Sequence, residues 1–127
     1  MELRDIEGLD EEKGITFCGS REGWVTILTS FVRDLPSYLL DIEKYHDAGD
    51  WKSYSRKVHG MKSSFRAIGI EELSLMAQEL EKYSDSEDIA AVDTKHGIFL
   101  EKCGYYAKSI SQILFGDVGV EDKKEPV

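Results

Sequence analysis

The stretch that decides the fold is WKSYSRKVHGMKSSFRAI, residues 51–68. Its apolar side chains recur every three or four residues, the spacing that places side chains on one side of an α-helix. This apolar stripe consists of Trp51, Tyr54, Val58, Met61, Phe65 and Ile68. The sequence therefore predicts an amphipathic helix with one face in a hydrophobic core.

The opposite face of this predicted helix is polar and basic. No acidic residue occurs between Lys52 and Arg66, although the whole chain has a formal net charge of −9. At about 100° per residue, the positions near His59 are polar or basic. They are Lys52, Ser55, Arg56, Lys62, Ser63 and Arg66. We therefore expect His59 on a solvent-facing and locally positive surface.

His59 and Lys62 are suited to holding a phosphoryl group. A neutral imidazole is a competent nucleophile toward phosphorus near neutral pH. The ammonium of Lys62, one turn further on, would offset the negative charge of the phosphoryl oxygens. Ser55 and Ser63 lie four residues before and after His59 and leave room around the ring. The predicted surface would thus admit the active site of a partner.

These residues resemble the pattern of histidine-containing phosphotransfer (HPt) domains, which act in multistep phosphorelays of bacteria and plants. That pattern has a histidine, a lysine three residues later, small residues, and a glycine ten residues after the histidine. The corresponding residues are His59, Lys62, Ser63, Ser64 and Gly69, followed by Leu73, Leu80 and Glu81 at the family's leucine, leucine and glutamate positions. The resemblance spans roughly residues 9–114, and its specificity is concentrated in residues 58–81.

Three positions depart from the family pattern. Ser63 replaces the glycine that normally lies four residues after the histidine, and Phe65 and Arg66 replace smaller residues. Because serine is still small, we expect Ser63 to alter docking or partner choice without removing the chemistry. Phe65 falls on the apolar stripe and is predicted to point inward. Arg66 lies on the His59 face and is expected to touch a partner.

The resemblance implies a phosphocarrier. His59 would accept a phosphoryl group from the aspartyl phosphate of one response-regulator receiver domain and pass it to another receiver, with a hybrid histidine kinase as a further candidate partner. Mg²⁺ would belong to the receiver, and no cofactor is expected on this chain. Lys62 would stabilise the phosphoryl charge, and Gly69 would end the helix. The expected partner-binding residues are Lys52, Ser55, Arg56, Ser63 and Arg66.

The chain has no nucleotide-binding signature, neither a Gly-x-x-x-x-Gly-Lys loop nor a kinase glycine motif. It is therefore expected to be a reactant in transfer more than a catalyst in its own right. Two alternatives keep the same fold. One is an adaptor that docks receivers without being phosphorylated, and the other is the phosphorylated N-terminal domain of a chemotaxis-type kinase.

A metal-binding bundle is an alternative from another class. Glu43 and His46, like Asp93 and His96, form carboxylate-x-x-histidine pairs, a spacing used by bundles that bind two metals. Such a site needs two further inward carboxylates, and no core glutamate is obvious in the sequence. We therefore expect no metal site, and we expect His96, on an apolar stripe, to be a core or boundary histidine with one hydrogen-bond partner.

Composition limits the other possibilities. A chain of 127 residues with 41% hydrophobic residues suits a single domain. The surplus of acidic residues argues against nucleic acid as a partner. Cys18 and Cys103 are too few for a disulfide framework or a thiolate metal site. The absence of a secretory signal and of a transmembrane-length apolar run predicts a cytoplasmic protein that does not bind membranes.

The expected fold is all-α: an antiparallel four-helix bundle with a short additional N-terminal helix. The short helix spans 9–17 and stops at Gly19, after which Ser20 caps a long helix that is kinked at Pro36. Asp50 caps the helix that carries His59, and Gly69 closes it. Further helices are expected at 70–83 and 89–113, with a turn at 84–88. The bundle would occupy residues 1–115, and residues 116–127 would form a flexible tail.

Overall fold

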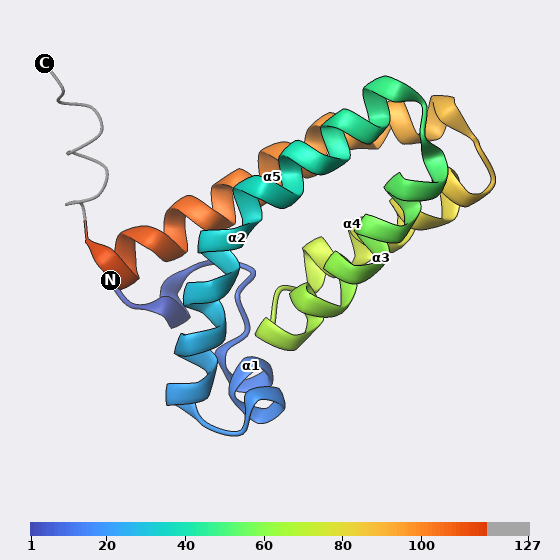
Figure 1. The fold of residues 1–127 in the computed structure, drawn as a ribbon. Coiled ribbons are helices and arrows are strands. Elements are labelled where there is room, and N and C mark those ends of the chain that lie inside the picture. The colour runs from blue at the N-terminus through green and yellow to red at the C-terminus, as the bar shows by residue number, and fades with distance from the viewer. Residues whose placement is uncertain (117–127) are drawn as a thin grey trace, which may run out of the picture.

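The structure, a computed structural model, describes residues 1–116 and is all-helical over that range (Figure 1). No strand occurs among these residues. The expected flexible tail lies, apart from Gly116, outside the described residues. The elements are the 3₁₀ turn η1 (Leu3–Asp5) and the helices α1 (Glu11–Cys18), α2 (Arg21–Ala48), α3 (Trp51–Ile68), α4 (Glu71–Asp85) and α5 (Ile89–Phe115).

Local capping signals set most of the helix ends. The side chains of Ser20, Asp50 and Asp88 accept hydrogen bonds from backbone N–H groups in the first turns of α2, α3 and α5. These contacts satisfy donors that would otherwise have no partner within the helix. Gly49 and Gly69 end α2 and α3 in the left-handed conformation. The predicted caps at Ser20, Asp50 and Gly69 are confirmed.

Several predicted helix boundaries are wrong by one or two residues. The opening helix begins at Glu11 and not at residue 9, because Asp10 is its N-cap and accepts a hydrogen bond from the N–H of Lys13. The predicted turn at 84–88 is shorter, because Ser84 and Asp85 belong to the last turn of α4. Ser84 is buried, and its hydroxyl donates to the carbonyl of Leu80 within the same helix.

The helices pack in a ring of neighbours. Helix α2 packs against α3 and α5, and α4 packs against the same two helices, while α1 covers part of α2 and α3. In Figure 1, α2 and α5 lie side by side, and α3 forms a hairpin with α4. Helix α2 contains Pro36, and Figure 1 shows it changing direction in its middle part, as expected for a proline inside a helix.

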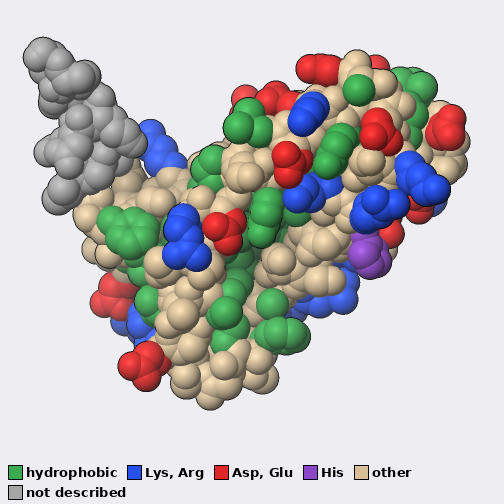
Figure 2. All heavy atoms as spheres, viewed as in Figure 1, with side chains coloured by type: hydrophobic (Ala, Val, Ile, Leu, Met, Phe, Trp, Pro, Cys, Tyr) green, Lys and Arg blue, Asp and Glu red, His purple; other side chains and the backbone are tan. Residues whose placement is uncertain are grey.

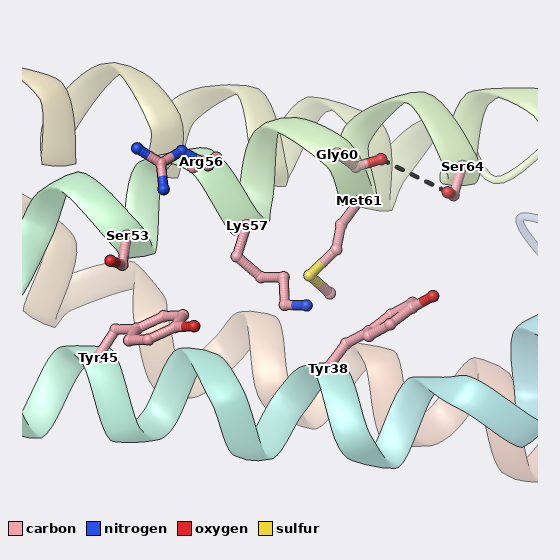
Figure 3. Close-up of a pocket in the computed structure, with 8 residues that line it drawn as sticks. All are labelled: Tyr38, Tyr45, Ser53, Arg56, Lys57, Gly60, Met61 and Ser64. Carbon is pink, nitrogen blue, oxygen red and sulfur yellow. Dashed lines mark hydrogen bonds between the residues drawn. The ribbon is translucent and has the colours of Figure 1, made fainter.

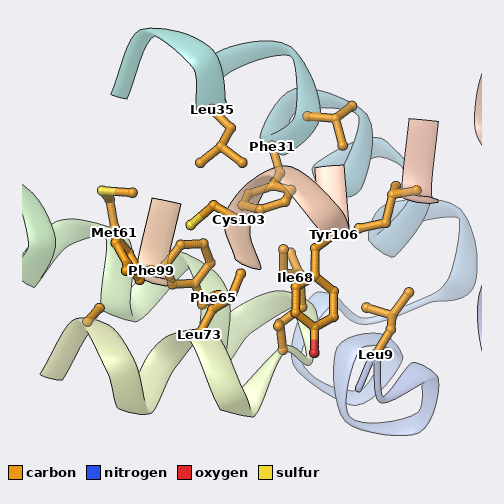
Figure 4. Close-up of a cluster of buried hydrophobic side chains, with 14 of the residues drawn as sticks. Leu9, Phe31, Leu35, Met61, Phe65, Ile68, Leu73, Phe99, Cys103 and Tyr106 are labelled. Atoms are coloured by element: carbon orange, nitrogen blue, oxygen red, sulfur yellow. The ribbon is translucent and has the colours of Figure 1, made fainter. Parts of the chain in front are cut away.

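Aromatic side chains join α3 to the rest of the core (Figure 4). The ring of Phe65 lies edge-on to Phe31 of α2 and Phe99 of α5, with centroids 5.7 Å and 6.0 Å apart. The indole N–H of the fully buried Trp24 donates to the carbonyl of Ile68 at 2.9 Å. Phe65 points inward as predicted. Because these contacts set the rotation of α3 about its axis, they also determine which of its residues face outward.

The part of the chain that the structure describes contains no helix that combines the length and apolar character needed to span a membrane.

Candidate phosphotransfer site

Helix α3 presents His59 to solvent. Its neighbours on the apolar stripe, Val58 and Met61, are 0% and 3% exposed, whereas the side chain of His59 is 60% exposed. The alternation follows from the helical period, because His59 is rotated by about 100° from Val58. The expectation that the imidazole is reachable from solvent is therefore confirmed.

A carboxylate on the neighbouring helix contacts both His59 and Lys62, the two residues that were predicted to take part in the chemistry. Oε2 of Glu81, on α4, lies 2.8 Å from Nδ1 of His59, and Oε1 lies 2.9 Å from Nζ of Lys62. Glu81 and Lys62 are largely covered, with side chains 22% and 19% exposed. One carboxylate thus holds a histidine and a lysine that lie one turn apart on α3.

The charge of Glu81 determines where the proton of His59 lies. Burial raises the pKa of Glu81, but the hydrogen bonds from Lys62 and His59 outweigh it and leave the pKa below its ordinary value. An ionised carboxylate can only accept hydrogen bonds, so Nδ1 of His59 must carry the proton. In the neutral ring the lone pair is then on Nε2, and within residues 1–116 this nitrogen has no hydrogen-bond partner. The contact therefore leaves Nε2 as the nucleophilic nitrogen.

Ser55 is not on the exposed face of α3. It was expected among the exposed partner-binding residues, but it is only 7% exposed, and its hydroxyl donates to the carboxylate of Asp85. The prediction is wrong because α4 packs along the side of α3 that carries Ser55. Lys62 also lies toward this side, so it is less exposed than its polar neighbours.

The other expected partner-binding residues are exposed: Lys52, Arg56, Ser63 and Arg66. Together with His59 they form one line along α3, at steps of four, three, four and three residues, which we call the exposed row. Among the described residues, none of the three basic members forms an ion pair. On the face that Figure 2 shows, Lys and Arg side chains gather beside the histidine in view, with Asp or Glu side chains close by. Positive charge thus remains available on the outer face of α3.

A groove runs beside this row, between α2 and α3 (Figure 3). It has a volume of about 400 Å³ and is lined by Tyr38 and Tyr45 from α2 and by Arg56 and Lys57 from α3. In Figure 3 the Lys57 side chain points toward α2. Nζ of Lys57 lies 3.1 Å from a carboxylate oxygen of Asp41 and 4.6 Å from the centroid of the Tyr38 ring. Because Arg56 belongs to both the groove and the exposed row, the two surfaces are continuous.

Glu81 is the site residue whose role the sequence did not predict. It appeared only as a position of the family pattern, because it lies 22 residues from His59 and no helical period relates the two. The contact arises from the packing of α4 on α3. That family position was the one signal available in the sequence.

The histidines considered for a metal site pair with protein groups instead. The rings of His46 and His96 stack with centroids 4.2 Å apart, Nε2 of His46 lies 2.7 Å from Asp93, and Nδ1 of His96 lies 2.8 Å from the hydroxyl of Tyr54. Burial, followed by the nearby His46, lowers the pKa of His96. The predicted boundary position and single hydrogen-bond partner of His96 are confirmed. Within residues 1–116, no cluster of three or more His, Cys, Asp or Glu side chains is arranged to hold a metal.

An all-helical protein with an exposed, carboxylate-paired histidine beside a lysine has the features of a histidine phosphotransfer protein. The family model described as Hpt domain matches residues 26–112, more than half of the chain. The chain therefore belongs to the Hpt domain family, whose members carry out histidine phosphotransfer in phosphorelays and interact with receiver domains. No curated protein and no solved structure matches the chain.

Proposed function

We propose that this chain is a phosphocarrier whose His59 takes a phosphoryl group from the aspartyl phosphate of one receiver domain and passes it to an aspartate of another. The observation that carries the proposal is the 2.8 Å contact between Nδ1 of His59 and Glu81 on a ring that is 60% exposed. The proposal includes an antiparallel four-helix arrangement of α2 to α5 and the cytoplasmic location expected from the sequence.

The geometry of the site supports the following transfer step. The lone pair on Nε2 of His59 attacks phosphorus, an N–P bond forms, and the bond between phosphorus and the aspartyl oxygen breaks, with its electrons leaving on the carboxylate. The proton on Nδ1 stays in place, so the ring becomes cationic. The Glu81 carboxylate stabilises that cation at once, because it is already in contact with Nδ1. The reverse step delivers the group to the next receiver.

The exposed row on α3 supports docking of a receiver. Lys52, Arg56 and Arg66 offer positive charge around His59, and the active sites of receiver domains are acidic. Complementary charges of this kind orient the encounter and raise the association rate, an effect that weakens as salt is added. The small side chain of Ser63 leaves space for the receiver next to His59. Mg²⁺ is supplied by the receiver in this proposal, and this chain contributes no cofactor.

The test is phosphoryl transfer from a phosphorylated receiver in the presence of Mg²⁺. Label on the chain that is lost in acid supports the phosphocarrier, because phosphohistidine is acid-labile. Binding of receivers without any label contradicts it and favours the docking adaptor. Label obtained only from ATP and a kinase catalytic domain, and never from a receiver, contradicts it in favour of the chemotaxis-type kinase domain.

Lys62→Ala is expected to slow phosphoryl transfer about tenfold, because one charge contact near a protein surface contributes on the order of 1–4 kcal/mol. Rapid-quench kinetics with a phosphorylated receiver measure the effect. Lys57→Ala is the matched control, since it removes one positive charge from the same helix at a residue paired with Asp41. Equal rates for Lys62→Ala and wild type would remove Lys62 from the transfer step.

Glu81→Gln and Glu81→Ala are expected to slow transfer to different extents. Glutamine keeps an oxygen that accepts the Nδ1 proton but loses the charge that stabilises the cationic ring, so we expect a loss of about tenfold. Alanine removes both contributions, and its loss should be greater. The rate of phosphoryl acceptance at neutral pH measures both. Wild-type rates in both variants would show that Glu81 has no part in transfer.

A further inference from the structure

A second polar contact links α3 and α4 one helical turn away from His59. The hydroxyl of Ser55 donates to a carboxylate oxygen of Asp85. Ser55 lies four residues before His59 on α3, and Asp85 lies four residues after Glu81 on α4. One turn forward on α3 therefore corresponds to one turn back on α4. The Ser55–Asp85 and His59–Glu81 contacts thus lie one helical turn apart along the interface between α3 and α4.

Local helix preferences do not account for either partner. Ser55 is a buried polar side chain in a helix interior, and Asp85 is the last residue of α4. A negative side chain at the C-terminal end of a helix is electrostatically unfavourable, since that end carries a partial negative charge. The hydrogen bond between α3 and α4 compensates for both unfavourable placements. It gives the serine hydroxyl an acceptor and the carboxylate a donor.

This contact secures the turn that carries Glu81. In an α-helix the N–H of residue 85 bonds to the carbonyl of residue 81, and terminal turns are the part of a helix that frays most readily. Attaching Asp85 to α3 keeps that last turn closed. His59 itself is 60% exposed, so packing does not hold its ring. The distance between His59 and Glu81 therefore depends on where α4 places the carboxylate.

We propose that Ser55 and Asp85 are positioning residues for the phosphotransfer histidine: their hydrogen bond holds Glu81 where it keeps the proton of His59 on Nδ1 and leaves Nε2 unprotonated. The effect on transfer rate rests on the function proposed above. The effect on the tautomer of His59 does not, because it is a property of the free chain.

Substitutions at both partners test the proposal in the full chain. ¹⁵N NMR of the His59 imidazole, at a pH where the ring is neutral, should show mainly the Nδ1–H form in wild type. Ser55→Ala and Asp85→Ala should both shift the ring toward Nε2–H and slow phosphoryl acceptance about fivefold, the factor equivalent to one hydrogen bond of about 1 kcal/mol. The double variant should be no worse than either single one.

Asp85→Asn is the matched control, since the amide keeps an oxygen for the Ser55 hydroxyl and removes only the charge. It should retain the wild-type tautomer and rate. Thermal unfolding of every variant separates positioning from stability. The proposal is overturned if Ser55→Ala lowers only the melting temperature, or if Asp85→Asn behaves like Asp85→Ala. A tautomer shift in Ser55→Ala, with no receiver able to label wild type, would support positioning while the proposed function fails.

Discussion

His59→Gln is expected to abolish phosphoryl acceptance while leaving the fold intact. Glutamine has no ring nitrogen to form an N–P bond, so no acid-labile label should be detected with any phosphorylated receiver. The unfolding free energy should change by only about 1 kcal/mol or less, because the side chain is 60% exposed and Lys62 still pairs with Glu81. Circular dichroism and a receiver pull-down measure helicity and binding, both of which should match wild type.

His46→Gln is the matched control for this prediction. It applies the same substitution to a histidine that pairs with Asp93 near the junction of α2 and α5, and it should retain full acceptance. Acid-labile label that persists in His59→Gln would mean that another histidine is the acceptor. A loss of helicity in His59→Gln would contradict the placement of this residue on an exposed face.

Gly69→Ala is expected to be the most destabilising single substitution considered, at about 2–5 kcal/mol. Gly69 has a φ of +90°, which costs an L-residue about 1–2 kcal/mol. A Cβ there would also clash with the carbonyl oxygen of Asp10, and this oxygen belongs to the backbone and cannot rotate away as a side chain could. The close approach exists because the N–H of Asp10 donates to the carbonyl of Gly69 at 2.8 Å. Urea unfolding measures the loss.

Gly49→Ala separates the two contributions. Gly49 ends α2 with a φ of +69°, and a Cβ there would meet nothing within 4 Å. Its substitution should cost only the conformational part, about 1–2 kcal/mol. If Gly69→Ala destabilises the protein no more than Gly49→Ala, the contact with Asp10 is not the tight constraint that the structure indicates.

Much of the helical pattern could be predicted from sequence because it has local causes. The three-and-four spacing from Tyr54 to Ile68 predicted the buried face of α3, and the same spacing placed His59 outside it. Caps such as Ser20 and Asp50 act within three residues, so their side chains were informative without any knowledge of packing. The boundary at Ser84 was missed since this residue is buried in the last turn of α4, and burial depends on packing between helices.

The site was predictable in part for the same reason. His59 and Lys62 lie one turn apart on one helix, so the sequence alone placed them together. Ser55 was wrongly predicted to be exposed. The helical period shows that Ser55 lies off the apolar stripe of α3, but it does not show whether another helix covers that position. Glu81 was not assigned a role since its contact with His59 is made across two packed helices.

The sequence by itself determined the helices, the caps at Ser20, Asp50 and Gly69, and the exposure of His59, because a helix is built from hydrogen bonds and capping contacts that span three or four residues. The tertiary structure alone decided which carboxylates meet α3. The axial register of α4 against α3 brings Glu81 to His59 and Lys62, and it brings Asp85 to Ser55. That register is set by how the side chains of two helices pack together. The periodicity of one helix in the sequence does not predict it.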